Sequence, residues 1–210
     1  MICGIDEAGR GPLAGPVCAA AVVLPADFPT AQLDDSKKLK PKQRETLCRL
    51  IVETAPAWGI GWASHAEIDV INILQASLLA MQRAFNSLLT PMPGNSVWPQ
   101  RLETEAPFGK PFILPPDLTA VVDGLHAPQL PIPCRAQVKA DASIHEVMAA
   151  SILAKTARDQ LMEYYSKLYP EYGYERHKGY PTVDHRNRIL QYGPSPIQRK
   201  SFKVIPPGVF

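Results

Sequence analysis

The stretch GIDEAGRGPLAGPV, residues 4–17, decides the fold of this chain. Residues 2–5 predict a short buried strand that ends at two adjacent carboxylates, Asp6 and Glu7, and residues 17–24 predict a second strand that returns beside it. Neighbouring residues of a strand point to opposite faces, so both acids can face solvent only where the strand ends. A strand that ends in two acids is difficult to explain by packing alone and indicates a functional site.

The glycines on either side of Arg10 admit two interpretations. Gly9 and Gly11 have no Cβ, so backbone N–H groups there can approach a phosphate or a sugar closely, and Arg10 can add a charge or a hydrogen bond. A tight turn is the other interpretation, because Gly-x-Gly is common in turns. The pair of glycines alone does not decide between them.

Composition predicts one well-packed domain. The chain has 210 residues, of which 46% are hydrophobic, and a formal net charge of only +2, which does not by itself indicate a nucleic-acid binder. The charge is uneven, however. Residues 34–49 hold six Lys or Arg against three acids, and residues 176–203 hold seven against one. Each basic run is either a solvated surface or a surface for phosphates.

The cysteines and the apolar segments bear on metal content and location. The four cysteines form no CxxC pair, which argues against a zinc site. We see no signal peptide and no apolar stretch approaching the roughly 20 residues that span a bilayer. We therefore expect a cytoplasmic protein that does not contact the membrane.

Strands and helices alternate along the chain, which predicts the α/β class with a mixed central sheet flanked by helices. The apolar stripe of residues 67–89 predicts the clearest helix. Ser143 and Glu146 have the spacing of a capping box at the start of another helix. The remaining expected strands are 58–63, 118–122 and 134–138, and the remaining expected helices begin at Pro41 and near Val183.

Acids stand at the ends of three expected strands: Asp6 and Glu7, then Asp123, then Asp141. Ligands of open α/β sheets gather at the carboxyl ends of strands. Carboxylates held together repel each other, and Mg²⁺ or Mn²⁺ relieves that repulsion. Two such ions about 4 Å apart can promote cleavage of a phosphodiester. Taken singly, Asp123 also suits an Asp-Gly turn and Asp141 also suits a helix cap, but the set favours a metal site.

The ordered motifs of the chain resemble the ribonuclease HII family. The resemblance covers most of the chain, and the order of the motifs makes it specific. The motifs are GIDEAGRGPLAGPV, DSKKL, GWAS, EIDVINILQASLLAM, VVDG, KADASIHEVMAASILAKTARD, HKGYPT and PIQRKSF.

The resemblance implies a ribonuclease H-like fold with a helical C-terminal extension and an endonuclease that depends on two divalent ions, Mg²⁺ or Mn²⁺. It would cut the RNA strand of RNA–DNA hybrids, and it would cut 5′ of single ribonucleotides embedded in duplex DNA, leaving a 3′-hydroxyl and a 5′-phosphate. By the family pattern, the catalytic and metal-binding acids are Asp6, Glu7, Asp123 and Asp141. Gly9, Arg10 and Gly11 match the segment that senses the ribose 2′-OH, Tyr180 matches the residue that stacks at the junction, and Lys37 matches a position that contacts the backbone.

Other features of the chain complete these expectations. Within HKGYPT, Lys178 suits a phosphate contact, while His177 suits either a sugar–phosphate contact or an ordinary surface position. We expect a single catalytic domain over residues 1–210 and a monomer. A proline-rich insertion at about 90–116 departs from the family pattern, and about 170–210 forms a basic C-terminal segment. A type III ribonuclease H and a non-catalytic hybrid-binding module are the alternatives, although all four motif acids are present.

Overall fold

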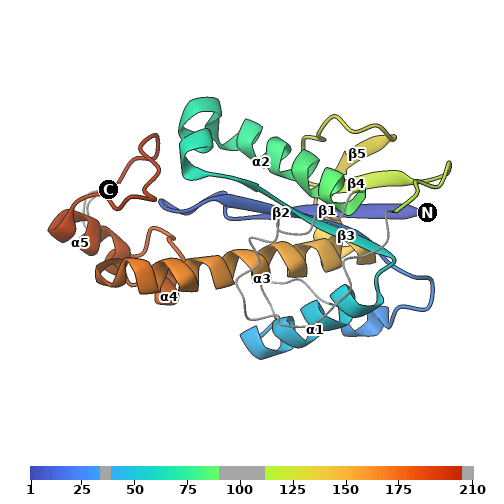
Figure 1. The fold of residues 1–210 in the computed structure, drawn as a ribbon, viewed down its shortest axis with the longest axis horizontal. Helices are drawn as coiled ribbons and strands as arrows, with labels where there is room; N and C mark the ends of the chain where they lie inside the picture. The colour runs from blue at the N-terminus through green and yellow to red at the C-terminus, as the bar shows by residue number, and fades with distance from the viewer. Residues whose placement is uncertain (34–38, 90–111, 205–210) are drawn as a thin grey trace.

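The computed structural model describes residues 1–33, 39–89 and 112–204 (Figure 1). Its centre is a five-stranded mixed sheet in the order β3-β2-β1-β4-β5. The strands are β1 (Ile2–Ala8), β2 (Val17–Val23), β3 (Ala57–Ala63), β4 (Thr119–Asp123) and β5 (Cys134–Gln137). The helices are α1 (Pro41–Thr54), α2 (His65–Leu89), α3 (His145–Leu168), α4 (Tyr174–His177) and α5 (Val183–Tyr192), with short 3₁₀ turns η1 (Thr30–Gln32), η2 (Ala140–Ala142) and η3 (Pro170–Tyr172). The predicted α/β class with a mixed sheet and flanking helices is confirmed.

Strand β1 is longer than its apolar residues predict. It continues through both acids to Ala8, because β2 pairs with it antiparallel over that whole half, with Asp6 opposite Ala20 and Glu7 opposite Ala19. The prediction that the strand ends at the acids is therefore wrong. The two side chains point to opposite faces of the sheet, as the alternation of a strand requires.

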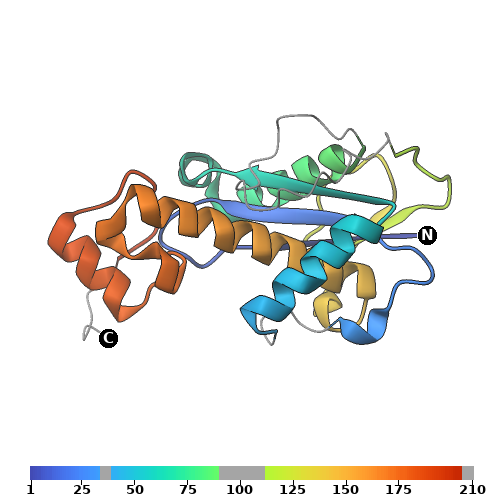
Figure 2. The same cartoon turned by 60° about the horizontal axis from the view of Figure 1, so that its bottom comes forward.

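Helix α2 covers one face of the sheet, and α1 and α3 cover the other (Figures 1 and 2). A Cβ added at Gly59 would lie 2.3 Å from the Ala84 carbonyl oxygen, so α2 packs directly on the β3 backbone. The helix is broken at Asn72, whose φ of 65° is left-handed and whose Oδ1 accepts the N–H of Leu74 at 3.0 Å. The second part of α2 thus has an Asn cap, which the continuous apolar stripe did not predict.

Helix α3 runs along the long axis of the molecule (Figure 2). It begins at His145, so the N-cap position falls on Ile144, whose apolar side chain cannot cap the helix, and the Ser143 hydroxyl donates to the Lys139 carbonyl instead. The predicted capping box is therefore wrong. Within the helix, the Lys155 ammonium and Asp159 Oδ1, one turn apart, form an ion pair at 2.7 Å.

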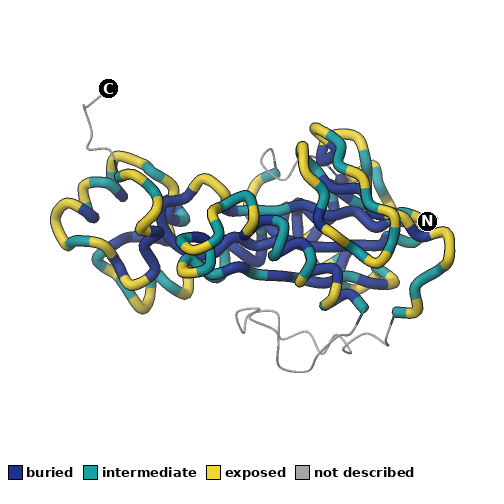
Figure 3. The backbone as a smooth tube through the Cα atoms, turned by 90° about the horizontal axis from the view of Figure 1, so that it is seen from above, coloured by how far each residue is buried: buried dark blue, intermediate teal, exposed yellow. Residues whose placement is uncertain are grey.

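The chain after α3 forms the helical extension that the family resemblance implies, with α4 and α5 beyond the end of the sheet (Figure 1). Buried residues run continuously from the sheet into this extension (Figure 3). A small core around Met162, Tyr172 and Tyr174 joins it to α3 and to Ala14 of the glycine-rich loop, residues 9–16 between β1 and β2. Of the insertion predicted at about 90–116, residues 112–115 have no regular structure and a turn begins at residue 116. The rest of the insertion lies outside the described residues.

Candidate active site

Strand register brings the predicted acids to one edge of the sheet. Strand β4 runs parallel to β1 with Ile5 opposite Val122, so Asp6 and Asp123 come next on neighbouring strands. Asp123 Oδ1 accepts the Ala140 N–H at 2.8 Å, which fixes the start of η2, the turn that contains buried Asp141. The carboxyl ends of β1, β4 and β5 therefore assemble residues that are 135 positions apart in the sequence.

Asp6 carries the most perturbed carboxyl group of this edge. Burial raises its pKa well above the usual value, and the charges of Glu7 and Asp123 raise it further. A hydrogen bond from Ser151 on α3 and one from the Glu7 N–H, at 2.7 Å, oppose that rise. Placing these three carboxylates together is thus electrostatically unfavourable without a cation.

Glu7 is partly compensated by Arg10. Its Oε1 accepts a hydrogen bond from Arg10 Nη1 at 3.2 Å, but its Oε2 is buried and has no partner among the residues that the structure describes. Burial raises the pKa of Glu7, and Arg10 opposes the rise. Arg10 and Asp123 also line a single pocket against α2. An orphaned carboxylate oxygen beside two further acids is the chemistry that a hard divalent cation satisfies.

The acids do not form a finished ligand set in this structure. Within residues 1–33, 39–89 and 112–204, no three His, Cys, Asp or Glu side chains are arranged to hold one ion. Asp123 is engaged with the Ala140 N–H and Glu7 with Arg10. The charge, the burial and the orphaned oxygen fit a divalent cation, and these two side chains would exchange their present partners for it.

Two buried arginines that the sequence analysis missed hold the glycine-rich loop. Arg158, from α3, donates to the carbonyls of Ala14 and Pro16 at 3.2 and 3.0 Å. Arg199, from the extension, donates to the carbonyls of Gly9, Arg10 and Gly15 at 2.6, 2.9 and 2.8 Å. A basic residue ordinarily predicts an exposed side chain, so composition gives no sign that these two are buried. The only signal in the sequence is that they lie in motifs that resemble the family.

Gly9 is required by this arrangement. Its φ is +98°, and a Cβ there would lie 1.9 Å from Arg158 Nε. Any side chain would both strain the backbone and displace the guanidinium. The structure therefore gives Gly9 a left-handed backbone and a close approach to the Arg158 side chain, with bends at residues 10 and 11.

Tyr180 lies beside this loop. The residue is 39% exposed, and a Cβ at Gly11 would be 3.7 Å from its Cε1. The Lys155 ammonium and the Arg158 guanidinium lie 5.8 and 5.9 Å from the ring centroid, within the range of a cation–π interaction. The structure thus brings Tyr180 to the loop that resembles the ribose-sensing segment.

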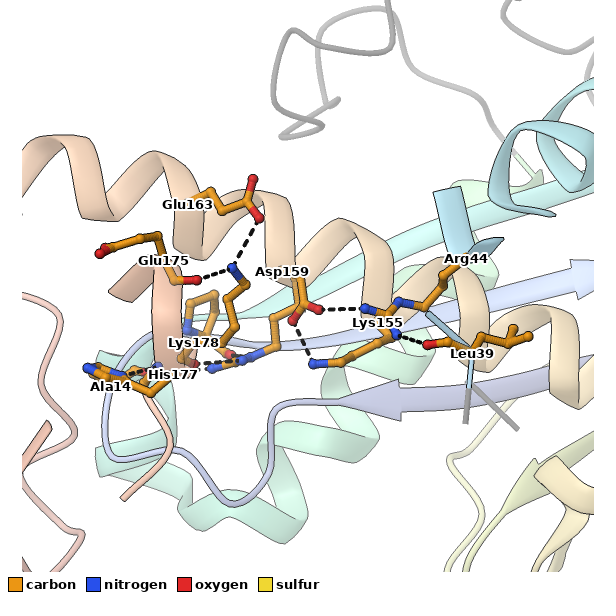
Figure 4. A network of polar contacts seen from close by, with 12 residues as sticks. Ala14, Leu39, Arg44, Lys155, Asp159, Glu163, Glu175, His177 and Lys178 are labelled. Atoms are coloured by element: carbon orange, nitrogen blue, oxygen red, sulfur yellow. Dashed lines mark hydrogen bonds and ion pairs between the residues drawn. The ribbon is translucent and has the colours of Figure 1, made fainter. Parts of the chain in front are cut away.

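The remaining predicted contacts are placed differently. The Lys178 ammonium bonds to Glu163 Oε1 at 3.0 Å and to the Glu175 carbonyl at 2.6 Å (Figure 4), so internal partners occupy it. His177 is buried, which excludes the surface position considered for it. Lys37 lies outside the described residues. Figure 4 shows a further polar group nearby, in which Asp159 bridges Lys155 and Arg44.

The strand order β3-β2-β1-β4-β5, with helices on both faces and acids at one edge, is that of ribonuclease H-like proteins, as the match to a solved structure shows. The ribonuclease H2 of Pyrococcus horikoshii matches with a TM-score of 0.68 at 26% identity, covering 97% of this chain and 94% of that one. The Bst ribonuclease HIII in complex with Mn²⁺ shares the fold at 16% identity, with a TM-score of 0.62 and coverage of 91% and 62%.

Sequence comparison then identifies the family. The family model for ribonuclease HII matches residues 3–205. The ribonuclease HII of Treponema denticola is 52% identical over 207 residues, covering 97% of this chain and 98% of that protein. The chain belongs to the ribonuclease HII family and is a ribonuclease H, an endoribonuclease.

The structure bears on the expectation that the protein does not contact a membrane in one respect. No helix among the described residues is long and apolar enough to cross a bilayer.

Proposed function

We propose that this enzyme hydrolyses the RNA strand of RNA–DNA hybrids and cuts 5′ of single ribonucleotides embedded in duplex DNA, leaving a 3′-hydroxyl and a 5′-phosphate. The observation that carries the proposal is the set of acids Asp6, Glu7 and Asp123 at a sheet edge beside the glycine-rich loop, where burial and neighbouring carboxylates raise the pKa values of Asp6 and Glu7. A nuclease must test for the 2′-OH to tell RNA from DNA.

The carboxylates of Asp6, Glu7, Asp123 and Asp141 would hold Mg²⁺ or Mn²⁺. When bound, two such ions supply an activated water and charge stabilisation at the leaving oxygen. The orphaned Glu7 Oε2 and the raised pKa of Asp6 support this assignment, as does the Mn²⁺ complex of the Bst enzyme with the same fold. Mg²⁺ or Mn²⁺ should therefore raise the melting temperature of the protein, and Asp6→Asn should abolish that rise.

The remaining site residues recognise the substrate. Gly9, Arg10 and Gly11 present backbone groups to the ribose, and the exposed face of Tyr180 packs on the sugar at the junction between ribonucleotide and deoxyribonucleotide. The guanidinium of Arg10, now paired with Glu7, is close enough to the acids to contact a nearby phosphate. Such an active site would cleave next to a ribose and spare a DNA duplex that lacks it.

One assay tests the proposal. The protein is given three labelled duplexes, namely a hybrid, a DNA duplex with one ribonucleotide and an all-DNA duplex, across a series of divalent metals. We expect cleavage of the first two only, and a metal requirement. Asp123→Asn should nearly abolish cleavage while circular dichroism stays unchanged, whereas exposed Asp27→Asn should have no effect. Normal turnover by folded Asp123→Asn at saturating Mg²⁺ would refute the role of this carboxylate.

The same assay separates the alternatives. Cleavage of the hybrid without cleavage at a lone ribonucleotide would favour activity like that of type III enzymes. Binding of both substrates without cleavage in any metal would favour a non-catalytic module.

A further inference from the structure

Arg199 is buried beneath the glycine-rich loop without a carboxylate partner. Its side chain is fully buried, and its guanidinium donates three hydrogen bonds, to the carbonyls of Gly9, Arg10 and Gly15. No Asp or Glu in the described part of the chain forms an ion pair with it: the Asp69 carboxylate acts on it only through its charge, as the Arg158 guanidinium does with opposite sign. The centroid of the Phe202 ring lies 5.0 Å from Cζ. Its own backbone N–H bonds to the Leu13 carbonyl at 2.9 Å.

A buried cation of this kind needs an explanation beyond stability. Removing a guanidinium from water is costly, and three neutral carbonyls compensate it less well than a carboxylate would. An apolar side chain of similar volume would fill the same space without that cost. What an apolar side chain could not do is fix the direction of three carbonyl groups in one loop.

The direction of these carbonyls fixes the direction of the next N–H groups. In a trans peptide the C=O of one residue and the N–H of the next point in opposite directions, and the peptide bonds here are trans. Because the Gly9 and Arg10 carbonyls point inward to Arg199, the N–H groups of Arg10 and Gly11 point away from it. Both residues are exposed, and neither N–H bonds to another group among the residues that the structure describes.

We propose that Arg199 is a positioning residue, which turns the backbone N–H groups of Arg10 and Gly11 toward the 2′-oxygen of the substrate ribose. Two consecutive outward N–H groups form a small concave donor site for an oxygen. The ring of Tyr180 lies next to Gly11, so the donors and the ring would meet the same nucleotide. This inference rests on the proposed function, since it assigns the preference for ribose to a residue far from the loop in sequence.

The test measures discrimination rather than activity alone. Dissociation constants are measured in the Asp123→Asn background for two duplexes that differ only in one 2′-OH. Arg199→Lys keeps the charge but loses the planar fork that reaches three carbonyls. We expect it to reduce the preference for the ribonucleotide duplex on the order of tenfold, since one neutral hydrogen bond is worth roughly 2- to 12-fold. Binding of the all-DNA duplex should not change.

A second variant removes a donor without touching the arginine. Gly11→Pro deletes one of the two N–H groups, and the nearest heavy atom to a Cβ there is 3.7 Å away, so a Cβ has room. It should reproduce the loss of discrimination with Arg199 intact. The matched control is Arg188→Lys, because Arg188 also donates to a carbonyl of the extension, that of Glu171, without contacting the loop. It should leave discrimination unchanged.

The outcomes separate this inference from the proposed function. If the parent enzyme fails to cleave at a lone ribonucleotide, the proposed function is wrong. If the parent cleaves there but Arg199→Lys and Gly11→Pro keep its preference, the inference is wrong. It is also wrong if both duplexes lose affinity equally, because that result would mean that the N–H groups bind a phosphate or that Arg199 only stabilises the fold.

Discussion

Two stacked imidazoles make the stability of the C-terminal extension depend on pH. The rings of His177 and His185 lie 4.4 Å apart between centroids, with planes 17° from parallel. His185 Nδ1 donates to the Tyr180 carbonyl at 3.0 Å, and its buried Nε2 has no partner within the described residues. Burial lowers the pKa of His185 from 6.5 to about 4, and the charge of His177 contributes to the shift.

The sign of the effect follows from where the proton binds. The unfolded chain binds a proton to this histidine below pH 6.5, whereas the folded chain binds it only near pH 4. The contribution of His185 to stability is therefore complete above pH 6.5 and is lost as the pH falls toward 4. Each pKa unit corresponds to about 1.4 kcal/mol, so the loss is at most about 3 kcal/mol.

Other groups modify the pH dependence of the whole protein. Burial also lowers the pKa of His177, which acts in the same direction. Asp184, 3.9 Å from His177 Nε2, opposes that shift. Asp6 and Glu7, whose pKa values are raised, act oppositely, since protonation relieves their repulsion as the pH falls. A single unfolding curve therefore cannot isolate the histidine.

A difference between variants can isolate it. His185→Asn keeps an N–H donor but does not titrate. Urea unfolding is measured from pH 7.5 to 4.5 for the parent, for His185→Asn and for exposed His145→Asn as the control. The parent and the control should lose up to about 3 kcal/mol more over this range than His185→Asn does. Parallel curves for all three would refute the assignment of this pH dependence to the stacked pair.

Three further predictions concern named side chains. Tyr180→Ala should lose more activity than Tyr180→Phe, because stacking is worth about 1–3 kcal/mol and one hydrogen bond about 0.5–1.5 kcal/mol. The loss should be larger at a single embedded ribonucleotide than on a long hybrid. Equal losses on both substrates with a lowered melting temperature would mean a packing role. Lys178→Ala should leave the salt dependence of substrate binding unchanged, because Glu163 and the Glu175 carbonyl occupy its ammonium; a slope smaller by about one would mean that it contacts a phosphate. Gly59→Ala should lower the melting temperature without changing the metal requirement, since the added Cβ meets α2 at 2.3 Å; unchanged stability would mean that the helix shifts freely.

The sequence pattern predicted the structure correctly where interactions between residues close in the chain determine it. Alternation of apolar runs with helical stripes predicted the mixed sheet, and Pro41 begins α1 as expected, because proline suits the first turn of a helix. It failed at boundaries that depend on a partner. Strand β1 continues past its apolar residues because β2 also pairs with Asp6 and Glu7. Asn72 breaks α2 although the apolar stripe continues through it.

The sequence by itself determined the family, the class of fold and the acids that stand near the ends of strands. Only the tertiary structure decided which side chains are buried together, because burial depends on contacts between residues that are distant in the chain. Arg199 and Lys178 show the difference. Both belong to a basic tail that composition describes as solvated or bound to phosphate, yet Arg199 is buried under a loop that begins 190 residues earlier, and Lys178 is paired with Glu163. The environment of a charged side chain depends on the carbonyls and carboxylates that surround it after folding. These groups come from distant parts of the chain, so the neighbouring sequence does not predict them.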